Sequence, residues 1–258
     1  MPFLDFAIGR TYFRHWCAEA PRAQVLLLHG FGEHTGHYHR LAAHLTSIGI
    51  DVWAPDHIGH GLTGGTPGLF DSLDDLAANA VAVLDVAHRS AEALPIAVVG
   101  HSLGALTGVR VAEHRPDLVR GLVLTGAPLW GLPPDAAGRT DLVMAVDEEY
   151  LDALDTDPLG FDTAPAEDNL WRVLNDSGPL IADRLSRSTL PVLFINGQHD
   201  AFAYPANADA LSARMAGGRA VTIRGGYHDI PNDRAHRRVA GLIGESVLEF
   251  CGVQAKNL

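Results

Sequence analysis

The sequence is poor in cysteine, the residue that cross-links small domains and takes part in many structural zinc sites. Its 258 residues include two cysteines, Cys17 and Cys251, which lie near opposite ends of the chain without C-x-x-C spacing. We therefore expect neither a disulfide framework nor a structural zinc site. Lysine is almost absent, since Lys256 is the only one, and this bias says nothing about chemistry.

The chain also lacks the features of membrane and nucleic-acid proteins. No apolar run approaches the roughly 18 residues that span a bilayer. The N-terminus has no basic region followed by an apolar core, as a signal peptide would. The formal net charge of -12 disfavours nucleic acid and anionic membrane surfaces as partners. We expect a cytoplasmic protein without stable membrane association, and the sequence leaves its oligomeric state open.

What the chain does have is enough apolar sequence for one large α/β domain. Hydrophobic residues make up 47% of it, and apolar strand-like stretches alternate with helical patterns from residue 24 to residue 124. Such alternation predicts a mostly parallel sheet covered by helices on both faces. The expected strands are 24–28, 51–55, 96–99, 118–124, 191–195 and 220–223, preceded by an edge hairpin over 3–16 centred on Gly9 and Arg10.

The alternation breaks between residues 127 and 190. This segment is rich in Asp, Pro and Gly, and a structureless loop of that length inside a domain is unusual. We therefore predict that 127–190 forms a small helical cap, and that 1–126 together with 191–258 forms the core domain.

The stretch Gly100-His101-Ser102-Leu103-Gly104 follows an apolar strand and precedes a helical pattern. This is the context that the G-x-S-x-G motif requires, in which a serine is exposed on a sharp turn between strand and helix. Gly100 and Gly104 are expected where strand and helix pass too closely for a Cβ atom. The sequence thus predicts Ser102 as a nucleophile.

An acid and a base follow the serine at the ends of two later strands. Ligands of a parallel sheet bind at the carboxyl ends of its strands, where Asp200 and His228 are expected beside Ser102. The order Ser, Asp, His is that of nucleophile-elbow hydrolases. His228 would take the serine proton while Asp200 orients its imidazole. The backbone N–H groups of Leu103 and Phe31 are the candidate oxyanion donors.

Together these motifs resemble the α/β-hydrolase fold, and within it the monoacylglycerol lipase and lysophospholipase-like serine hydrolases. The resemblance covers the chain outside the predicted cap and rests on HGFGEH at 29–34 with Tyr38, DHIGHG at 56–61, GHSLG at 100–104, NGQHD at 196–200, and Tyr227-His228. It implies hydrolysis of a carboxylic ester, often a monoacylglycerol, without a cofactor. The chain departs from the family where His57 stands in place of a frequent arginine and Ala105 in place of a second glycine.

The predicted cap is more acidic than the caps of the family. Its acidic residues should discourage docking on anionic lipid and disfavour anionic substrates. We expect a small-molecule substrate, a neutral ester of a small to medium acyl chain. An acyl pocket could be lined by Trp130, Leu132, Trp171 and Leu174, which could equally form the cap's own core.

Several polar residues near the glycine-rich loops have structural interpretations. Glu33 and His34 are expected to brace the oxyanion loop, and Asp56 and His60 to fix the next loop by hydrogen bonds. The pattern His34-x-x-His37-x-His39 could converge on a metal. We expect none, because no carboxylate or cysteine completes an evident set and the following helix would splay the side chains.

The three residues Ser102, Asp200 and His228, the predicted catalytic triad, do not determine which leaving group is cleaved. A thioesterase, a lactone hydrolase and a C–C bond hydrolase therefore remain alternatives, as does a slow-turnover ligand-binding receptor on a hydrolase scaffold. Dehalogenase and epoxide hydrolase chemistry is disfavoured, because those relatives carry aspartate where Ser102 stands.

Overall fold

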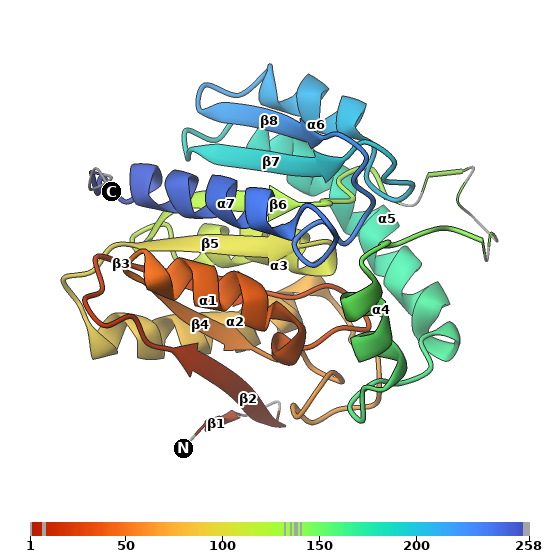
Figure 1. Ribbon diagram of the computed structural model, residues 1–258, viewed down its shortest axis with the longest axis horizontal. Coiled ribbons are helices and arrows are strands. Elements are labelled where there is room, and N and C mark those ends of the chain that lie inside the picture. The colour runs from red at the N-terminus through yellow and green to blue at the C-terminus, as the bar shows by residue number, and fades with distance from the viewer. Residues whose placement is uncertain are drawn as a thin grey trace.

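A computed structural model describes residues 2–6, 9–131, 133–134, 136, 139 and 141–254. It contains a sheet of eight strands in the order β1-β2-β4-β3-β5-β6-β7-β8 (Figure 1). The strands are β1 (Phe3–Phe6), β2 (Gly9–Trp16), β3 (Ala23–Leu28), β4 (Ile50–Pro55), β5 (Ile96–His101), β6 (Val119–Thr125), β7 (Val192–Gly197) and β8 (Gly218–Ile223).

The helices are α1 (His39–Ser47), α2 (Leu73–Ser90), α3 (Leu103–His114), α4 (Glu148–Asp155), α5 (Glu167–Leu185), α6 (Pro205–Ser212) and α7 (His236–Phe250). Two short 3₁₀ helices, η1 (Thr35–Tyr38) and η2 (Ala164–Ala166), precede α1 and α5. No helix in these described ranges is both long enough and apolar enough to cross a bilayer.

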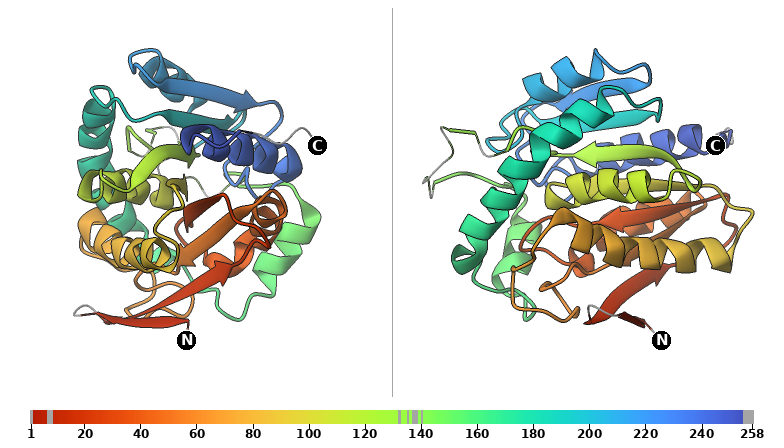
Figure 2. Two further views of the ribbon diagram at one scale, coloured as in Figure 1. Left: turned by 90° about the vertical axis from the view of Figure 1, so that its left-hand side faces the viewer. Right: turned by 180° about the vertical axis from the view of Figure 1, so that it is seen from behind.

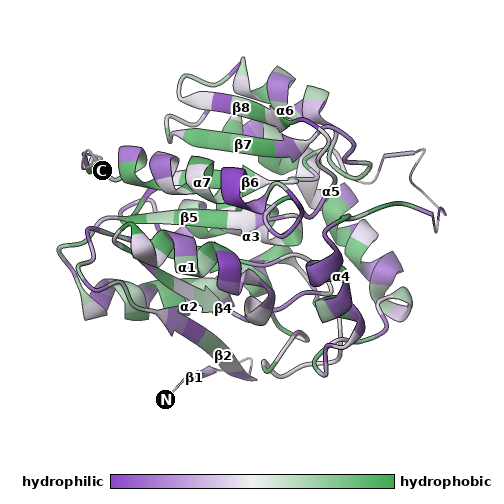
Figure 3. Ribbon diagram, viewed as in Figure 1, coloured by the Kyte–Doolittle hydropathy of each residue, from purple (hydrophilic) through white to green (hydrophobic). Residues whose placement is uncertain are grey.

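The strands from β3 to β8 form a parallel sheet, as the alternating pattern predicts. β4, β3, β5, β6, β7 and β8 are parallel neighbours, and β3, β4, β5 and β7 are buried along their whole lengths. Burial on both faces explains why these strands are mostly apolar (Figure 3), and each of them buries one polar residue: Gln24, Asp51, His101 and Asn196. The edge hairpin is also present, but Phe6 pairs with Gly9, so its turn precedes Gly9 and is not centred on Gly9 and Arg10.

Helices cover both faces of the sheet (Figures 1 and 2). Leu27 and Val99 point into one hydrophobic layer with α1 and α7, while Leu28 and Val98 point into the other with α2, α3, α5 and α6. Successive residues of one strand therefore enter opposite layers, as the pleat requires. The Ser72 hydroxyl caps α2 by accepting the Asp75 N–H at 3.3 Å.

The segment between β6 and β7 contains α4, η2 and α5, which lie toward the end of the sheet where the parallel strands finish (Figure 1). α5 is continuous with the main core, because Leu170, Leu174, Ile181 and Leu185 belong to the layer that also holds α2 and α3. The division of the chain at residues 127 and 190 stays a prediction.

The turn between β5 and α3 is set by backbone crowding. Ser102 has φ 50° and ψ −116°, a left-handed conformation that costs free energy in a residue with a Cβ. A Cβ on Gly100 would lie 2.3 Å from the Gly104 carbonyl oxygen, which is the predicted close approach of strand and helix. A Cβ on Gly104 would instead lie 2.2 Å from the carbonyl oxygen of Leu28, so this second glycine lets α3 pack on the end of β3.

Replacing Gly104 by alanine should therefore displace the start of α3 from β3. We expect Gly104→Ala to lower the thermal unfolding midpoint by several degrees or to prevent folding, because backbone atoms cannot rotate away as a side chain can. Gly241→Ala is the matched control: it lies inside α7 with no atom within 4 Å of its new Cβ, and helix propensity favours alanine by about 1 kcal/mol. Equal midpoints for wild type and Gly104→Ala would contradict this account.

Candidate active site

Three side chains meet at the carboxyl ends of β5, β7 and β8. Ser102 Oγ lies 2.9 Å from His228 Nε2, and His228 Nδ1 lies 2.9 Å from Asp200 Oδ1. Asp200 Oδ1 also accepts the N–H groups of Phe202 and Ala203, at 2.9 and 2.8 Å. The carboxylate is thus held in place by backbone donors, and it in turn fixes an imidazole tautomer that carries its proton on Nδ1.

Two loops adjoin the hydroxyl of Ser102. Leu103 is the first residue of α3, where backbone N–H groups have no partner inside the helix and the helix dipole favours negative charge. The loop after β3 approaches from the other side, because a Cβ built on Gly30 would lie 3.4 Å from that of Ser102. Phe31 follows Gly30 directly, so both predicted oxyanion donors belong to backbone that adjoins the serine.

The buried carboxylate of Glu33 holds the loop after β3. Glu33 Oε2 accepts the N–H of Gly30 and the hydroxyl of Tyr38, both at 2.6 Å, which confirms that Glu33 braces this loop. Glu33 Oε1 accepts the hydroxyl of Tyr150 at 2.9 Å. Burial raises the pKa of Glu33, but His101, His37 and these donors together lower it below its ordinary value. Glu33 is therefore an anion in the folded protein.

Tyr150 of α4 bridges two buried carboxylates behind the serine. Its hydroxyl lies 2.9 Å from Glu33 Oε1 and 3.3 Å from Asp229 Oδ2, and Asp229 Oδ1 lies 3.2 Å from His101 Nε2. Asp229 thus hydrogen-bonds to Tyr150 and His101, and one of its carboxylate oxygens also lies within 4.8 Å of a ring nitrogen of His228. Sequence reasoning missed Tyr150 and His101; the x position of G-x-S-x-G was a signal for His101, whereas nothing local marks Tyr150.

The surrounding carboxylates control the basicity of His228. Burial lowers its pKa, but Asp200 raises it by its charge and its hydrogen bond. The charges of Asp229 and Glu33 raise it further, and the result is a pKa of about 9. An imidazole with this pKa is mostly protonated at neutral pH, so it accepts a proton from Ser102 only as the pH rises toward 9.

The loop after β4 is fixed as expected. Asp56 Oδ1 accepts the N–H of Thr35 at 2.8 Å and Asp56 Oδ2 that of Leu62 at 2.9 Å, so this carboxylate joins two loops. His60 Nδ1 lies 3.0 Å from the Ile58 carbonyl oxygen. Both residues have the structural roles that their positions predict.

His57, which stands where the resembling family often has arginine, is a neutral side chain. Its Nε2 lies 3.0 Å from the His29 carbonyl oxygen, and its backbone N–H donates to His29 Nε2 at 2.9 Å. Burial and the neighbouring His60 lower its pKa to about 3. The position therefore keeps its contacts with the loop after β3 without carrying a positive charge at neutral pH.

The four residues expected to line an acyl pocket have different surroundings. The indole of Trp171 stacks on Phe202 at a centroid distance of 5.9 Å, and the Phe202 ring lies 5.1 Å from that of His228. Leu174 is 2% exposed in the main core, so it offers no surface to a substrate, whereas Trp130 is 42% exposed. Leu132 lies outside the described residues. Of the four residues, Trp171 is the one with a described ring contact, through Phe202, to the candidate active-site residue His228.

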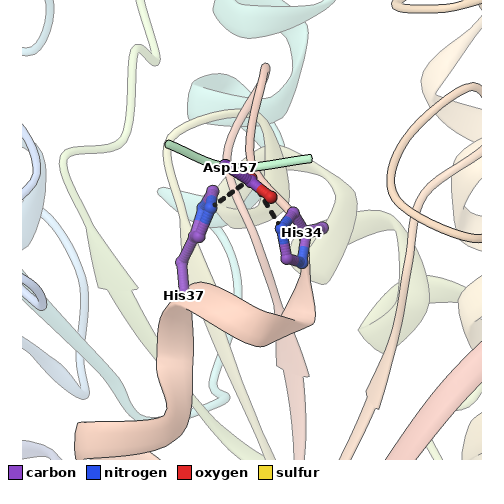
Figure 4. Close-up of side chains that lie close together, drawn as sticks. All are labelled: His34, His37 and Asp157. Atoms are coloured by element: carbon purple, nitrogen blue, oxygen red, sulfur yellow. Dashed lines mark hydrogen bonds and ion pairs between the residues drawn. The ribbon is translucent and has the colours of Figure 1, made fainter. Parts of the chain in front are cut away.

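The expectation that the histidines after β3 diverge is wrong for two of them. His34 Nε2 and His37 Nε2 lie 2.8 and 2.9 Å from Asp157 Oδ2, on the segment after α4 (Figure 4). The carboxylate that the nearby sequence lacks is thus supplied from more than a hundred residues away. His39 is exposed, with its Nδ1 3.3 Å from the Gly36 carbonyl oxygen, and takes no part.

Comparison with known proteins agrees with this architecture. The family described as "Serine aminopeptidase, S33" matches residues 19–146. The monoacylglycerol lipase of Mycolicibacterium smegmatis is 28% identical over 261 residues, which cover 89% of this chain and 90% of that protein. The chain has the α/β-hydrolase fold, and its sequence is similar to those of monoacylglycerol lipases.

Other relatives of this α/β-hydrolase match over part of their length. The human monoglyceride lipase is 32% identical over 139 residues, and the monoglyceride lipase homolog of Monkeypox virus is 33% identical over 135 residues. These matches cover 53% and 52% of this chain and span 46% and 48% of the two relatives, about half of their length.

Solved structures support the fold. A soluble variant of monoglyceride lipase from Saccharomyces cerevisiae superimposes with a TM-score of 0.82 at 18% identity, covering 96% of this chain and 94% of that one. The Paleococcus ferrophilus monoacylglycerol lipase gives 0.76 at 24% identity, covering 93% and 99%. At these identities the likeness shows the α/β-hydrolase fold alone.

The bridge from Tyr150 of this α/β-hydrolase to the two carboxylates should contribute measurably to stability. Tyr150→Phe removes the hydroxyl and leaves Glu33 Oε1 and Asp229 Oδ2 buried without that donor. We expect urea unfolding to show a loss of about 1–3 kcal/mol. Tyr12→Phe, which alters a partly exposed ring, should change stability far less. If the two variants lose the same stability, the bridge contributes nothing specific.

Proposed function

We propose that this protein hydrolyses carboxylic esters through an acyl-enzyme formed on Ser102. The proposal rests on one observation. The hydroxyl of Ser102, at the strand-to-helix turn, lies 2.9 Å from Nε2 of His228, and Nδ1 of the same imidazole lies 2.9 Å from the buried carboxylate of Asp200. The α/β-hydrolase fold and the names of the similar proteins point the same way.

In the proposed reaction, His228 takes the proton of Ser102 as the hydroxyl attacks the ester carbonyl carbon. The C–O bond to the alcohol breaks, the alcohol leaves with the proton from His228, and the acyl group stays on the serine oxygen. Water then attacks this second ester with the same base, releasing the carboxylic acid and restoring Ser102. The N–H groups of Phe31 and Leu103 are proposed to stabilise the oxyanion in both steps.

We propose a neutral, monoacylglycerol-like ester with a small or medium acyl chain as the substrate. The paired rings of Trp171 and Phe202 beside His228 offer an apolar surface for the acyl chain or the alcohol. The segment between β6 and β7 is acidic, with exposed carboxylates on α4 at Glu148, Glu149 and Asp152. These charges disfavour anionic substrates such as lysophospholipids.

The first test compares wild type with Ser102→Ala on glycerol and p-nitrophenyl monoesters from acetyl to stearoyl. We expect wild type to turn over with an optimum in chain length, and Ser102→Ala to lose at least about 10³-fold in kcat, because the three groups act as a unit. Ser212→Ala, a serine of α6 outside the site, should keep wild-type activity.

Other outcomes would replace the ester proposal. Turnover of thioesters, lactones or C–C substrates but not of simple esters would show that the same three residues cleave another class of bond. Stoichiometric labelling of Ser102 by a serine-reactive phosphonate with negligible turnover of every class would favour a ligand-binding receptor.

The pH dependence of kcat/KM tests the electrostatics of the base. Because His228 must be neutral to accept a proton and its pKa is about 9, activity should fall as the pH decreases below about 9. This acidic limb of the pH profile, the range over which activity falls with decreasing pH, lies above the pH 6–7 expected for an ordinary histidine.

Asp229→Asn should move that limb to lower pH, since it removes one charge that stabilises the protonated imidazole. Asp209→Asn, an exposed carboxylate on α6, should leave the profile unchanged. A limb that stays in place in Asp229→Asn would show that this charge does not act on the base.

A further inference from the structure

The cluster of His34, His37 and Asp157 lies outside the proposed chemistry. Its three ligand atoms, two imidazole Nε2 atoms and Asp157 Oδ2, all lie within 4.8 Å of one another. The three side chains are 9%, 7% and 9% exposed, so the cluster is nearly closed to solvent (Figure 4). We propose that these residues bind one divalent transition-metal ion, with Zn²⁺ as the best match.

The short 3₁₀ helix η1 brings the two histidines together. His34 is its N-cap and His37 lies within it, three residues later. His34 itself has an extended backbone (φ −155°, ψ 172°), and the turn of η1 brings His37 back beside it. The two imidazole rings lie 4.1 Å apart between centroids and present their Nε2 atoms to the same side (Figure 4).

The third ligand is held in position by its own backbone. Asp157 Oδ1 accepts the N–H of Leu159 at 2.9 Å, which leaves Oδ2 directed at both imidazoles. Burial raises the pKa of Asp157, but the Leu159 N–H and the two imidazoles lower it below the ordinary value, so the carboxylate is ionised. In metal sites a ligating carboxylate is typically held in its orientation by a hydrogen bond from a neighbouring group.

The separations are close to those around a tetrahedral ion. Zinc binds imidazole nitrogen and carboxylate oxygen at about 2.0–2.2 Å, which puts two ligand atoms about 3.3 Å apart. The N–O separations of 2.8 and 2.9 Å therefore need to widen by about half an ångström. Two histidines and one carboxylate suit zinc or another first-row divalent metal, with water completing the coordination.

Ligation requires the neutral form of both imidazoles, with the metal on Nε2 and the proton on Nδ1. His34 Nδ1 accepts the N–H of Gly36 at 2.9 Å, so without metal its proton lies on Nε2 and points at Asp157. Metal at Nε2 moves that proton to Nδ1 and gives up the Gly36 hydrogen bond. His37 loses no hydrogen bond in this way, but its buried Nδ1, which has no hydrogen-bond partner among the described residues, would then carry a proton without an acceptor.

A bound metal would connect two parts of the proposed active site. Asp157 follows α4, the helix of Tyr150, whereas His34 follows Glu33 on the loop after β3. The ion would fix α4 against that loop at a second point beside the Tyr150 hydroxyl. Because it binds the folded protein and not the separated segments, it should also raise the unfolding temperature.

Isothermal titration of EDTA-treated protein with Zn²⁺ tests the proposal, on wild type and on Ser102→Ala. We expect one ion per chain in both, because the site does not use the serine. His37→Ala, His34→Ala and Asp157→Asn should weaken binding by more than about 100-fold, beyond the 10–100-fold typical of outer-shell changes. His39→Ala is the matched control and should bind as wild type does.

Co²⁺ bound to wild type gives a second reading that needs no variant. A four-coordinate site predicts strong visible absorption, which Zn²⁺ should displace with the same one-to-one end point. Absence of stoichiometric binding to wild type would overturn the proposal. Equal loss of affinity in His39→Ala and His37→Ala would overturn it too, since the ion would then be held by scattered surface histidines. Neither result depends on whether the protein cleaves esters.

Discussion

The buried carboxylate of Glu33 joins the parts of the structure that the proposed chemistry needs. It holds the Gly30 end of the loop beside Ser102, receives the hydroxyls of Tyr38 and Tyr150, and contributes to the field at His228. A charge in this position is costly unless it is fully hydrogen-bonded. The three donors satisfy that requirement, and each comes from a different element, so the carboxylate can be accommodated only when the loop, η1 and α4 are all in place.

The same charge explains why the site's base is unusual. An imidazole in a buried site would normally lose basicity, because burial disfavours its cation. Here Asp200, Asp229 and Glu33 surround His228 closely enough to reverse that effect. The arrangement stabilises the imidazolium that forms during each proposed proton transfer, at the expense of the fraction of neutral base present at neutral pH. The same carboxylates therefore stabilise the His228 imidazolium during the reaction and reduce the fraction of neutral His228 that can start it.

The sequence predicted those parts of the structure that are set by local patterns. Continuous apolar runs predicted the buried strands, G-x-S-x-G predicted the turn at Ser102, and polar residues at strand ends predicted which side chains meet there. The misplaced hairpin turn and the convergence of His34 and His37 depended on details that periodicity does not carry. The extended backbone of His34 and the 3₁₀ turn that follows it let the two imidazoles meet, and the spacing of the histidines in the sequence does not indicate either feature.

The greatest gap between sequence and structure lies in the segment from β6 to β7. Tyr150 and Asp157 gain their importance from partners that are 117 and 123 residues away in the chain. No local rule pairs a tyrosine on an acidic helix with a glutamate in a glycine-rich loop. Both contacts nevertheless connect the same two segments, one through a hydroxyl shared by carboxylates and the other through a carboxylate shared by imidazoles. Tyr150 is the one buried residue of α4, so polar contacts rather than apolar packing hold this segment: the two just described, the ion pair of Arg40 with Asp147 at the start of the helix, and the hydrogen bond from the Val146 N–H to Asp233 Oδ1.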